Sequence, residues 1–140
     1  MKKVLHMVGH SHIDPVWFWR WEEGMQEVKA TFRSALERME AFADFRFTST
    51  SAAFFAYVQR VDPELFEQIR RRVQEGRWEI VGGWWVEPDC NLPCGEAFVR
   101  QGLYGQAYFQ KELGVRCTIG ANVDSFGHHP QLPQILKKSG

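Results

Sequence analysis

Two short segments near opposite ends of the chain carry side chains suited to metal chemistry. Segment 10–17 contains His12 and Asp14, and segment 122–128 contains Asp124. Each follows an apolar run that indicates a buried strand, and each puts an acidic residue, with a histidine nearby, where that strand ends. Because the carboxyl ends of parallel strands meet at one edge of a sheet, we expect these groups to converge there. Imidazole and carboxylate are ligands that zinc takes in proteins.

The spacing of the candidate ligands supports a single ion. His12 and Asp14 are two positions apart, so extended backbone puts both side chains on one face. His10 faces the same way and is either a ligand or a group that orients one. Asp124 can bind the metal, attack a substrate, or do both. The alternative, in which His12 caps a turn and Asp14 only precedes Pro15, is disfavoured by the second segment.

Aromatic and acidic side chains near these groups are typical of carbohydrate binding. Trp17 can stack on a sugar ring, and ordinary core packing is its alternative. Loop 82–91 holds two indoles, two carboxylates and an amide. We expect Trp85 and Asp89 of this loop to contact substrate, with Glu87 as a further carboxylate for sugar hydroxyl groups. The alternative is a capping loop with buried aromatic rings.

Further polar residues near the motifs are weaker candidates. His128 and His129 follow Asp124 and are expected to support the site or to be exposed. Cys90 and Cys94 have a C-x3-C spacing, but no second cysteine pair supports a zinc site there.

The elements that must position these residues alternate along the chain. Apolar runs predict strands at 4–9, 45–48, 78–81 and 118–123. Helices are predicted at 22–42, 51–59, 62–76, 96–113 and 131–138, the third with Asp62 as its N-cap and Pro63 at its first position. The first helix has apolar residues at helical spacing, namely Met25, Val28, Phe32, Ala35, Leu36 and Met39. This alternation predicts an α/β fold with a parallel sheet flanked by helices.

Composition excludes several classes of protein. The chain has 140 residues, no formal net charge and 44% hydrophobic residues, which is typical of one soluble globular unit. The balanced charge argues against nucleic acid and anionic membrane surfaces as partners. No stretch approaches the roughly 20 apolar residues of a membrane span, and the amino terminus lacks the apolar core of a signal peptide. Three cysteines form no disulfide framework, so we expect a cytoplasmic location.

Five motifs, in this order and spacing, resemble glycoside hydrolase family 38 α-mannosidases of the bacterial type, and the resemblance spans nearly the whole chain. They are HSHIDPVW at 10–17, GGWWVEPDCNLP at 82–93, VRQGLYGQ at 99–106, DSFGH at 124–128 and QILKKSG at 134–140. The resemblance implies that residues 1–140 are the N-terminal portion of a catalytic domain, part of a distorted β/α-barrel-like fold. We expect the remainder of the full-length chain downstream.

The same resemblance implies a zinc-dependent, retaining exo-α-mannosidase that acts on an α-mannoside or oligosaccharide. His12, Asp14 and Asp124 match three of four ligands of one Zn²⁺, Asp124 also matches the nucleophile, and Trp17 matches the aromatic residue under the mannose ring. Ser125 stands where many relatives have proline. The fourth ligand and the acid/base aspartate of the family lie further downstream, so we expect residues 1–140 alone to have little or no turnover. A homo-oligomer is left open.

Two other functions fit the same residues. A metal-dependent carbohydrate deacetylase also uses histidine and aspartate around one metal, but it activates a metal-bound water instead of a carboxylate nucleophile. A non-catalytic module that binds sugar or metal is the second alternative. A covalent sugar trapped on Asp124 would separate the glycosidase from the deacetylase, because only a retaining glycosidase forms it.

Overall fold

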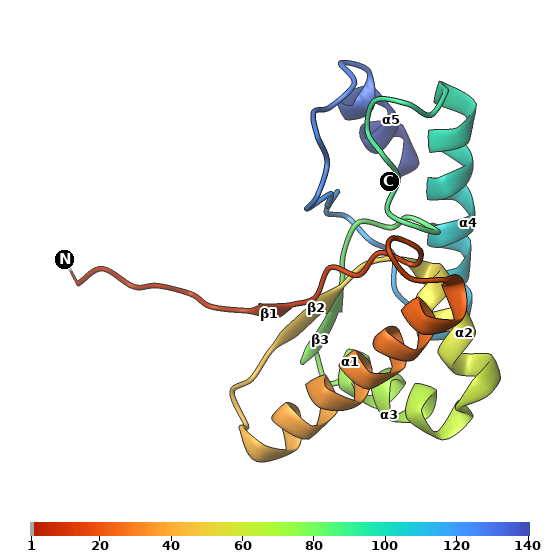
Figure 1. The fold of residues 1–140 in the computed structure, drawn as a ribbon. Coiled ribbons are helices and arrows are strands. Elements are labelled where there is room, and N and C mark those ends of the chain that lie inside the picture. The colour runs from red at the N-terminus through yellow and green to blue at the C-terminus, as the bar shows by residue number, and fades with distance from the viewer. Residues whose placement is uncertain (1) are drawn as a thin grey trace.

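The computed structural model describes residues 2–140 and confirms the α/β class (Figure 1). Strands β1 (Gly9–His10), β2 (Phe47–Ser49) and β3 (Trp78–Ile80) form a parallel sheet in the order β1-β2-β3. Gly9 pairs with Phe47, which pairs in turn with Trp78. The helices of the described residues are α1 (Trp21–Ala41), α2 (Ala52–Val61), α3 (Pro63–Gln74), α4 (Gly95–Leu113) and α5 (Leu132–Ser139).

The main core lies between the sheet and the helices α1, α2 and α3. All six apolar residues predicted for the inner face of α1 are buried. Trp78 of β3 is central: its ring packs edge-on against Phe32 of α1 and Phe47 of β2, and its indole N–H donates to Ser49 Oγ at 2.8 Å. A large aromatic ring gains both from burial and from this geometry. The helical periodicity of the sequence therefore predicted this part of the core correctly.

A second, smaller core holds the loop after β3 against α4 and α5. It consists of Trp84, Cys90, Phe98 and Leu132. In Figure 1 the helices α4 and α5 lie at the end of the molecule opposite to α1 and α3. Among the residues 2–140, no helix has the length and apolar character needed to cross a bilayer. The small core fixes loop 82–91, which carries several of the candidate site residues.

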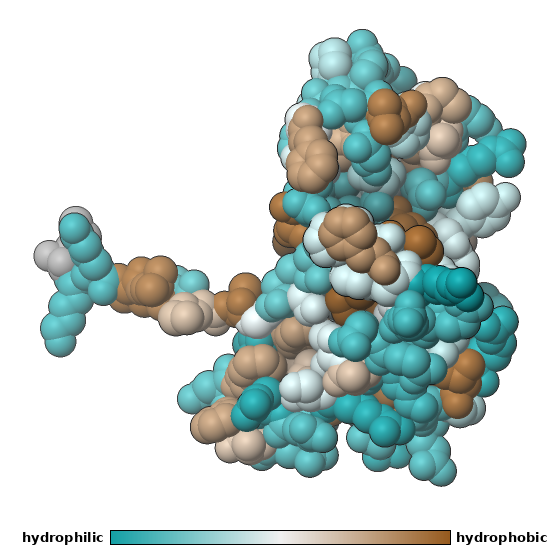
Figure 2. All heavy atoms as spheres, viewed as in Figure 1, coloured by the Kyte–Doolittle hydropathy of each residue, from teal (hydrophilic) through white to brown (hydrophobic). Residues whose placement is uncertain are grey.

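The predicted buried strand at 4–9 is wrong for most of its length. Only Gly9 and His10 form β1, and the side chains of Val4, Leu5, Met7 and Val8 are between 56% and 85% exposed. They form an extended arm with a hydrophobic surface (Figures 1 and 2). The reason is register: β2 begins at Phe47, the partner of Gly9, so residues 4–8 run past the start of β2 and have no partner strand in the described part of the chain.

The predicted strand at 118–123 is also absent from the described residues. One backbone hydrogen bond joins this segment to the end of β3, from Gly82 N–H to Ile119 O at 2.8 Å. Just before it, the side chain of Gln106 on α4 forms two hydrogen bonds with the backbone of Cys117. Its Oε1 accepts the Cys117 N–H at 3.0 Å, and its Nε2 donates to the Cys117 O at 2.8 Å. The chain is therefore bound to α4 at Cys117, just before this segment, and at Ile119 to the residue after β3. Apolar composition could not reveal this competition for backbone hydrogen bonds.

Asp62 is the N-cap of α3, as predicted, and its carboxylate also binds two basic side chains. Asp62 accepts the Leu65 N–H at 3.2 Å, and its carboxylate lies 2.9 Å from Lys29 Nζ and 2.7 Å from Arg33 Nη2. The hydrogen bonds from Lys29 and Arg33 lower the pKa of Asp62 to about 2. Because the pKa in the unfolded chain is about 3.9, ionised Asp62 stabilises the fold above about pH 4, and this stabilisation is lost as pH falls toward 2.

We therefore expect D62N to lower the free energy of unfolding by about 1 kcal/mol at neutral pH, since asparagine keeps the cap but loses two partly exposed ion pairs. The difference should shrink between about pH 4 and pH 3. Urea unfolding of both proteins at each pH measures it. A difference that does not change with pH contradicts the assignment of the stabilisation to the ionised carboxylate.

Candidate metal centre and substrate cleft

His12 and Asp14 converge although the backbone that carries them is not a strand. β1 ends at His10, and residues 11–14 are irregular. The His12 Nε2 nevertheless lies 3.6 Å from Asp14 Oδ1. The Trp19 indole donates to the backbone O of Asp14 at 3.0 Å and holds the turn that follows. The two candidate ligands therefore lie after the strand, on backbone that no strand pairing holds.

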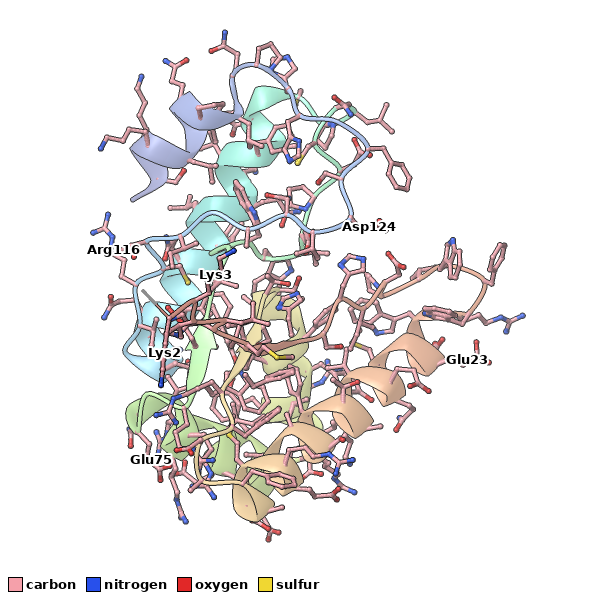
Figure 3. The ribbon with its side chains drawn as sticks, turned by 90° about the vertical axis from the view of Figure 1, so that its left-hand side faces the viewer. Lys2, Lys3, Glu23, Glu75, Arg116 and Asp124 are labelled. Atoms are coloured by element: carbon pink, nitrogen blue, oxygen red, sulfur yellow. The ribbon has the colours of Figure 1, made fainter. Side chains whose placement is uncertain are left out.

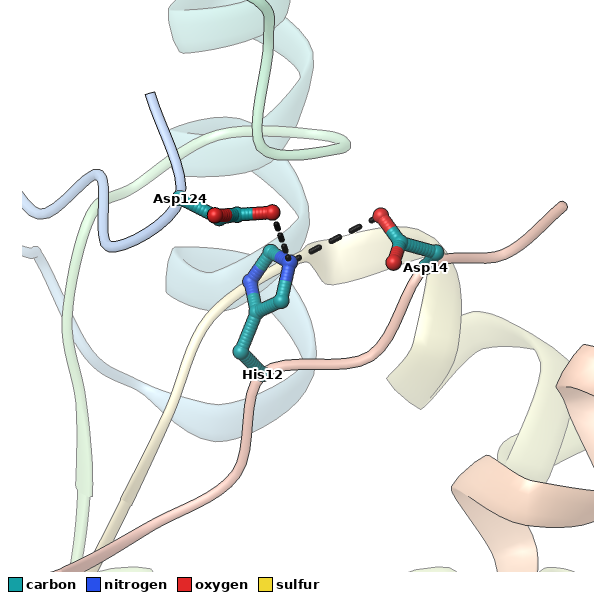
Figure 4. Close-up of side chains that lie close together, drawn as sticks. All are labelled: His12, Asp14 and Asp124. Carbon is teal, nitrogen blue, oxygen red and sulfur yellow. Dashed lines mark ion pairs between the residues drawn. The ribbon is translucent and has the colours of Figure 1, made fainter. Parts of the chain in front are cut away.

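Asp124 completes the cluster from the long connection between α4 and α5. Its Oδ2 lies 3.7 Å from the same His12 Nε2. Figure 4 shows the imidazole of His12 facing both carboxylates, and Figure 3 shows Asp124 on the side of the molecule that also carries Glu23, near the start of α1. One donor atom of each residue lies within 4.8 Å of the other two. The structure thus brings together the three predicted ligands from positions more than a hundred residues apart.

The donor set fits a zinc ion. Tetrahedral zinc, with bonds of about 2.0–2.2 Å to nitrogen and oxygen, separates its donors by roughly 3.4 Å. The two distances from His12 Nε2 are 3.6 and 3.7 Å. The side chains of His12, Asp14 and Asp124 are 30%, 40% and 55% exposed, so solvent and substrate can reach them. One imidazole and two carboxylates can hold a divalent cation and leave coordination positions free.

The donors open into a cleft of about 350 Å³ whose walls include Trp17. The Trp17 side chain is 62% exposed, so its alternative as a core residue is wrong. Its ring contacts Phe18 and Trp19, with ring centroids 4.3 and 5.4 Å away. An exposed indole beside a polar cluster is suited to stacking on the apolar face of a sugar.

The other two predicted substrate residues differ in their positions. Asp89 lines the cleft, and its Oδ1 accepts the N–H groups of Asn91 and Leu92, both at 2.8 Å. These two bonds lower the pKa of the Asp89 carboxyl. Trp85 is not part of the cleft wall; its ring packs edge-on against Tyr108, with centroids 6.0 Å apart. The structure therefore groups Asp89, but not Trp85, with the metal donors.

The weaker candidates lie outside the cluster of donors. His10 Nδ1 bonds Thr48 Oγ1 at 2.8 Å and so links β1 to β2. His129 Nδ1 accepts the Gln131 N–H at 3.1 Å, beside the start of α5. Cys90 is buried in the small core, and Cys94 is exposed at the N-cap of α4. None of the four belongs to the group of donor atoms found in the described residues.

Glu87 has a position that the sequence did not reveal. Two successive glycines with positive φ, Gly82 (83°) and Gly83 (70°), turn the chain out of β3 and start the loop that carries Glu87. Its Oε1 accepts the Val123 N–H at 2.6 Å, and its Oε2 lies 3.6 Å from His12 Nδ1. Glu87 also lines the cleft, so contact with sugar hydroxyl groups stays a prediction. In addition, its carboxylate lies against the backbone and the imidazole of the candidate metal site.

A parallel α/β fold with a cleft of metal donors beyond its strand ends is typical of a catalytic domain. Comparison with known proteins identifies the family: residues 2–140 match the model of the glycosyl hydrolases family 38 N-terminal domain, and the chain belongs to this family. The chain is 41% identical to alpha-mannosidase G of Dictyostelium discoideum over 133 residues, and 39% identical to alpha-mannosidase 2C1 of Homo sapiens over 137 residues.

These relatives are much longer than this chain. The matches cover 95% and 98% of the chain, but only 12% and 13% of the two relatives. The crystal structure of an alpha-mannosidase from Enterococcus faecalis V583 superposes with a TM-score of 0.84 and 28% identity, over 94% of this chain and 15% of that one. Family and fold are therefore established for the described residues.

Proposed function

We propose that residues 1–140 are the N-terminal portion of the catalytic domain of a zinc-dependent, retaining exo-α-mannosidase that hydrolyses terminal α-mannosyl residues of oligosaccharides. The observation that carries the proposal is the convergence of His12, Asp14 and Asp124 in a cleft beside the exposed ring of Trp17. The alpha-mannosidase names of the relatives support the substrate class.

Each residue has a distinct part in this reaction. A zinc ion held by His12, Asp14 and Asp124 would supply positive charge to vicinal hydroxyl groups of the mannosyl ring. Trp17 would support the apolar face of the ring. An oxygen of Asp124 would attack C1 and form an ester, while the glycosidic C1–O bond breaks and its electron pair goes to the leaving oxygen. Water would then hydrolyse the ester and release mannose.

The leaving oxygen needs a proton from a second carboxyl group, which in retaining enzymes lies about 5–5.5 Å from the nucleophile. We propose that this acid, and a fourth zinc ligand, come from the remainder of the full-length chain. The small share of the relatives that this chain covers supports this division of the site. Residues 1–140 alone should then release little or no mannose from an aryl α-mannoside.

The proposal extends to location and assembly. The three cysteines in the described residues are free thiols, which supports a reducing, cytoplasmic compartment. A homo-oligomer, left open by the resemblance, is tested by sedimentation of the natural protein. Nucleic acid and membranes are not proposed as partners, because the formal net charge is zero.

Metal removal tests the proposed function and gives the second prediction. We expect the natural protein at its full length to hold one zinc ion and to hydrolyse an aryl α-mannoside. Chelation should lower this activity at least about 100-fold, and added zinc should restore it, because the ion stabilises charge by several kcal/mol. Zinc content and hydrolysis rate are measured on the same samples. Release of acetate from acetylated sugars, without mannosidase activity, would favour the deacetylase; zinc binding without turnover would favour the binding module.

A further inference from the structure

We propose that Glu87 is a positioning residue of the metal site, whose single carboxylate orients the ring of His12 and fixes the backbone that carries Asp124. This inference rests on the proposed zinc-dependent function and assigns Glu87 a part in it other than contact with sugar.

The first half of the proposal follows from what surrounds the two ring nitrogens of His12. Nε2 faces the carboxylates of Asp14 and Asp124, so it is the nitrogen available to a metal. A neutral imidazole that binds metal through Nε2 carries its proton on Nδ1 and needs an acceptor there. Glu87 Oε2 is buried, lies 3.6 Å from Nδ1, and has no hydrogen-bond partner in the described residues. It is therefore a buried, unpaired acceptor beside the nitrogen at which the ligating form of His12 needs one.

The second half follows from the other oxygen of the same carboxylate. Oε1 accepts the Val123 N–H at 2.6 Å and lies 3.5 Å from the Asp124 N. The segment 118–123 does not form a strand, so no β-ladder sets the position of Asp124. One carboxylate therefore joins the two ligand-bearing segments and fixes the distance between His12 and Asp124.

Glu87 is itself held firmly enough to do this. Its side chain is 9% exposed, and its backbone N–H donates to Ser51 Oγ at 3.1 Å. Ser51 is buried before α2 with a φ of 65°, a left-handed conformation that is uncommon outside glycine. The neighbouring Val86 N–H donates to Gln101 Oε1 on α4 at 2.8 Å. Strained or unusual backbone of this kind persists where the surrounding contacts fix it, and it is often found at functional sites.

The substitution E87Q separates this role from general packing. Glutamine has nearly the same shape, but one of its two terminal groups is a donor. If its amide NH₂ faces His12 Nδ1, it favours the proton on Nε2 and blocks ligation. If it faces Val123, two donors meet and the backbone of Asp124 is released. Either orientation disturbs one ligand, whereas a residue that only fills space would tolerate the change.

We expect E87Q to weaken zinc binding by about 10- to 100-fold in the natural full-length protein, the range typical of groups that orient metal ligands. The zinc dissociation constant is measured by competition with a chelator, and the visible spectrum of the cobalt-substituted protein should shift. The matched control is E96Q, an exposed glutamate of α4 paired with Arg100, which should bind zinc as the wild type does.

The outcomes distinguish this proposal from the function on which it rests. A wild-type protein that binds zinc, with E87Q binding equally tightly and showing the same cobalt spectrum, overturns the role of Glu87 alone. A wild-type protein that binds no zinc overturns the proposed function and this role with it. Should E87Q fail to fold, Glu87→Asp replaces it: the charge is kept but the reach is shortened, so weaker zinc binding is again expected, and unchanged affinity overturns the proposal.

Discussion

The substitution D124N is expected to lower kcat for hydrolysis of an aryl α-mannoside by at least about 10⁴-fold, because loss of a catalytic nucleophile has effects of this size or larger. A neutral amide cannot form the ester with C1. Its carbonyl oxygen can still face the metal, so zinc content should fall less than activity does. Steady-state rates and zinc content of the natural protein and of D124N measure both effects.

A slow, fluorinated mannosyl donor identifies the attacked atom. In the wild-type protein we expect a covalent mannosyl adduct on the peptide that contains Asp124, and none in D124N. The control is D44N, which removes an exposed carboxylate in the turn after α1, far from the cleft residues in the sequence. Labelling of another residue would assign the nucleophile to that residue instead. Substantial turnover by D124N, or no adduct in the wild-type protein, would contradict attack by Asp124.

Sequence patterns predicted the parts of the fold whose stability is local. The apolar spacing in α1 and the Asp62-Pro63 start of α3 are decided by residues a few positions apart, and both were correct. The two end strands depend instead on distant partners. Residues 4–8 lack a strand beside them because of the register of β2, and the residue before 118–123, Cys117, is bound to α4 by Gln106. An apolar run alone cannot show which neighbouring element forms hydrogen bonds with its backbone.

The sequence predicted that His12, Asp14 and Asp124 lie together, but not what holds them there. Carboxylates and an imidazole after apolar runs were the signal, because these groups are typical of metal chemistry. The geometry, however, comes from side chains that join loops. Asn122 accepts the Trp84 indole N–H at 3.1 Å and donates to Pro88 O at 3.4 Å. Such pairings are set by tertiary structure and leave no periodic signal in the sequence.

The same loop depends on a close approach of helix α4, which gives the last prediction. Gly105 lies where α4 passes over the start of the loop that carries Glu87. A Cβ on Gly105 would meet Gly83 O at 2.2 Å and the backbone C of Trp84 at 2.4 Å. Both are backbone atoms, which cannot rotate away as a side chain can. Helix and loop would have to separate, and the buried ring of Trp84 would lose contacts in the small core.

We therefore expect G105A to lower the free energy of unfolding by about 2 kcal/mol, because overpacking against backbone, at up to about 3 kcal/mol, outweighs the helix propensity of up to about 1 kcal/mol that alanine adds. The control is G95A on the same helix, where a Cβ meets nothing within 4 Å, and which should leave stability unchanged or slightly raised. Urea unfolding midpoints of the natural protein measure both. Because the displaced loop also carries Glu87, G105A should weaken zinc binding as well, while G95A should not. A variant G105A as stable as the wild type would show that the contact between α4 and the loop does not position the site.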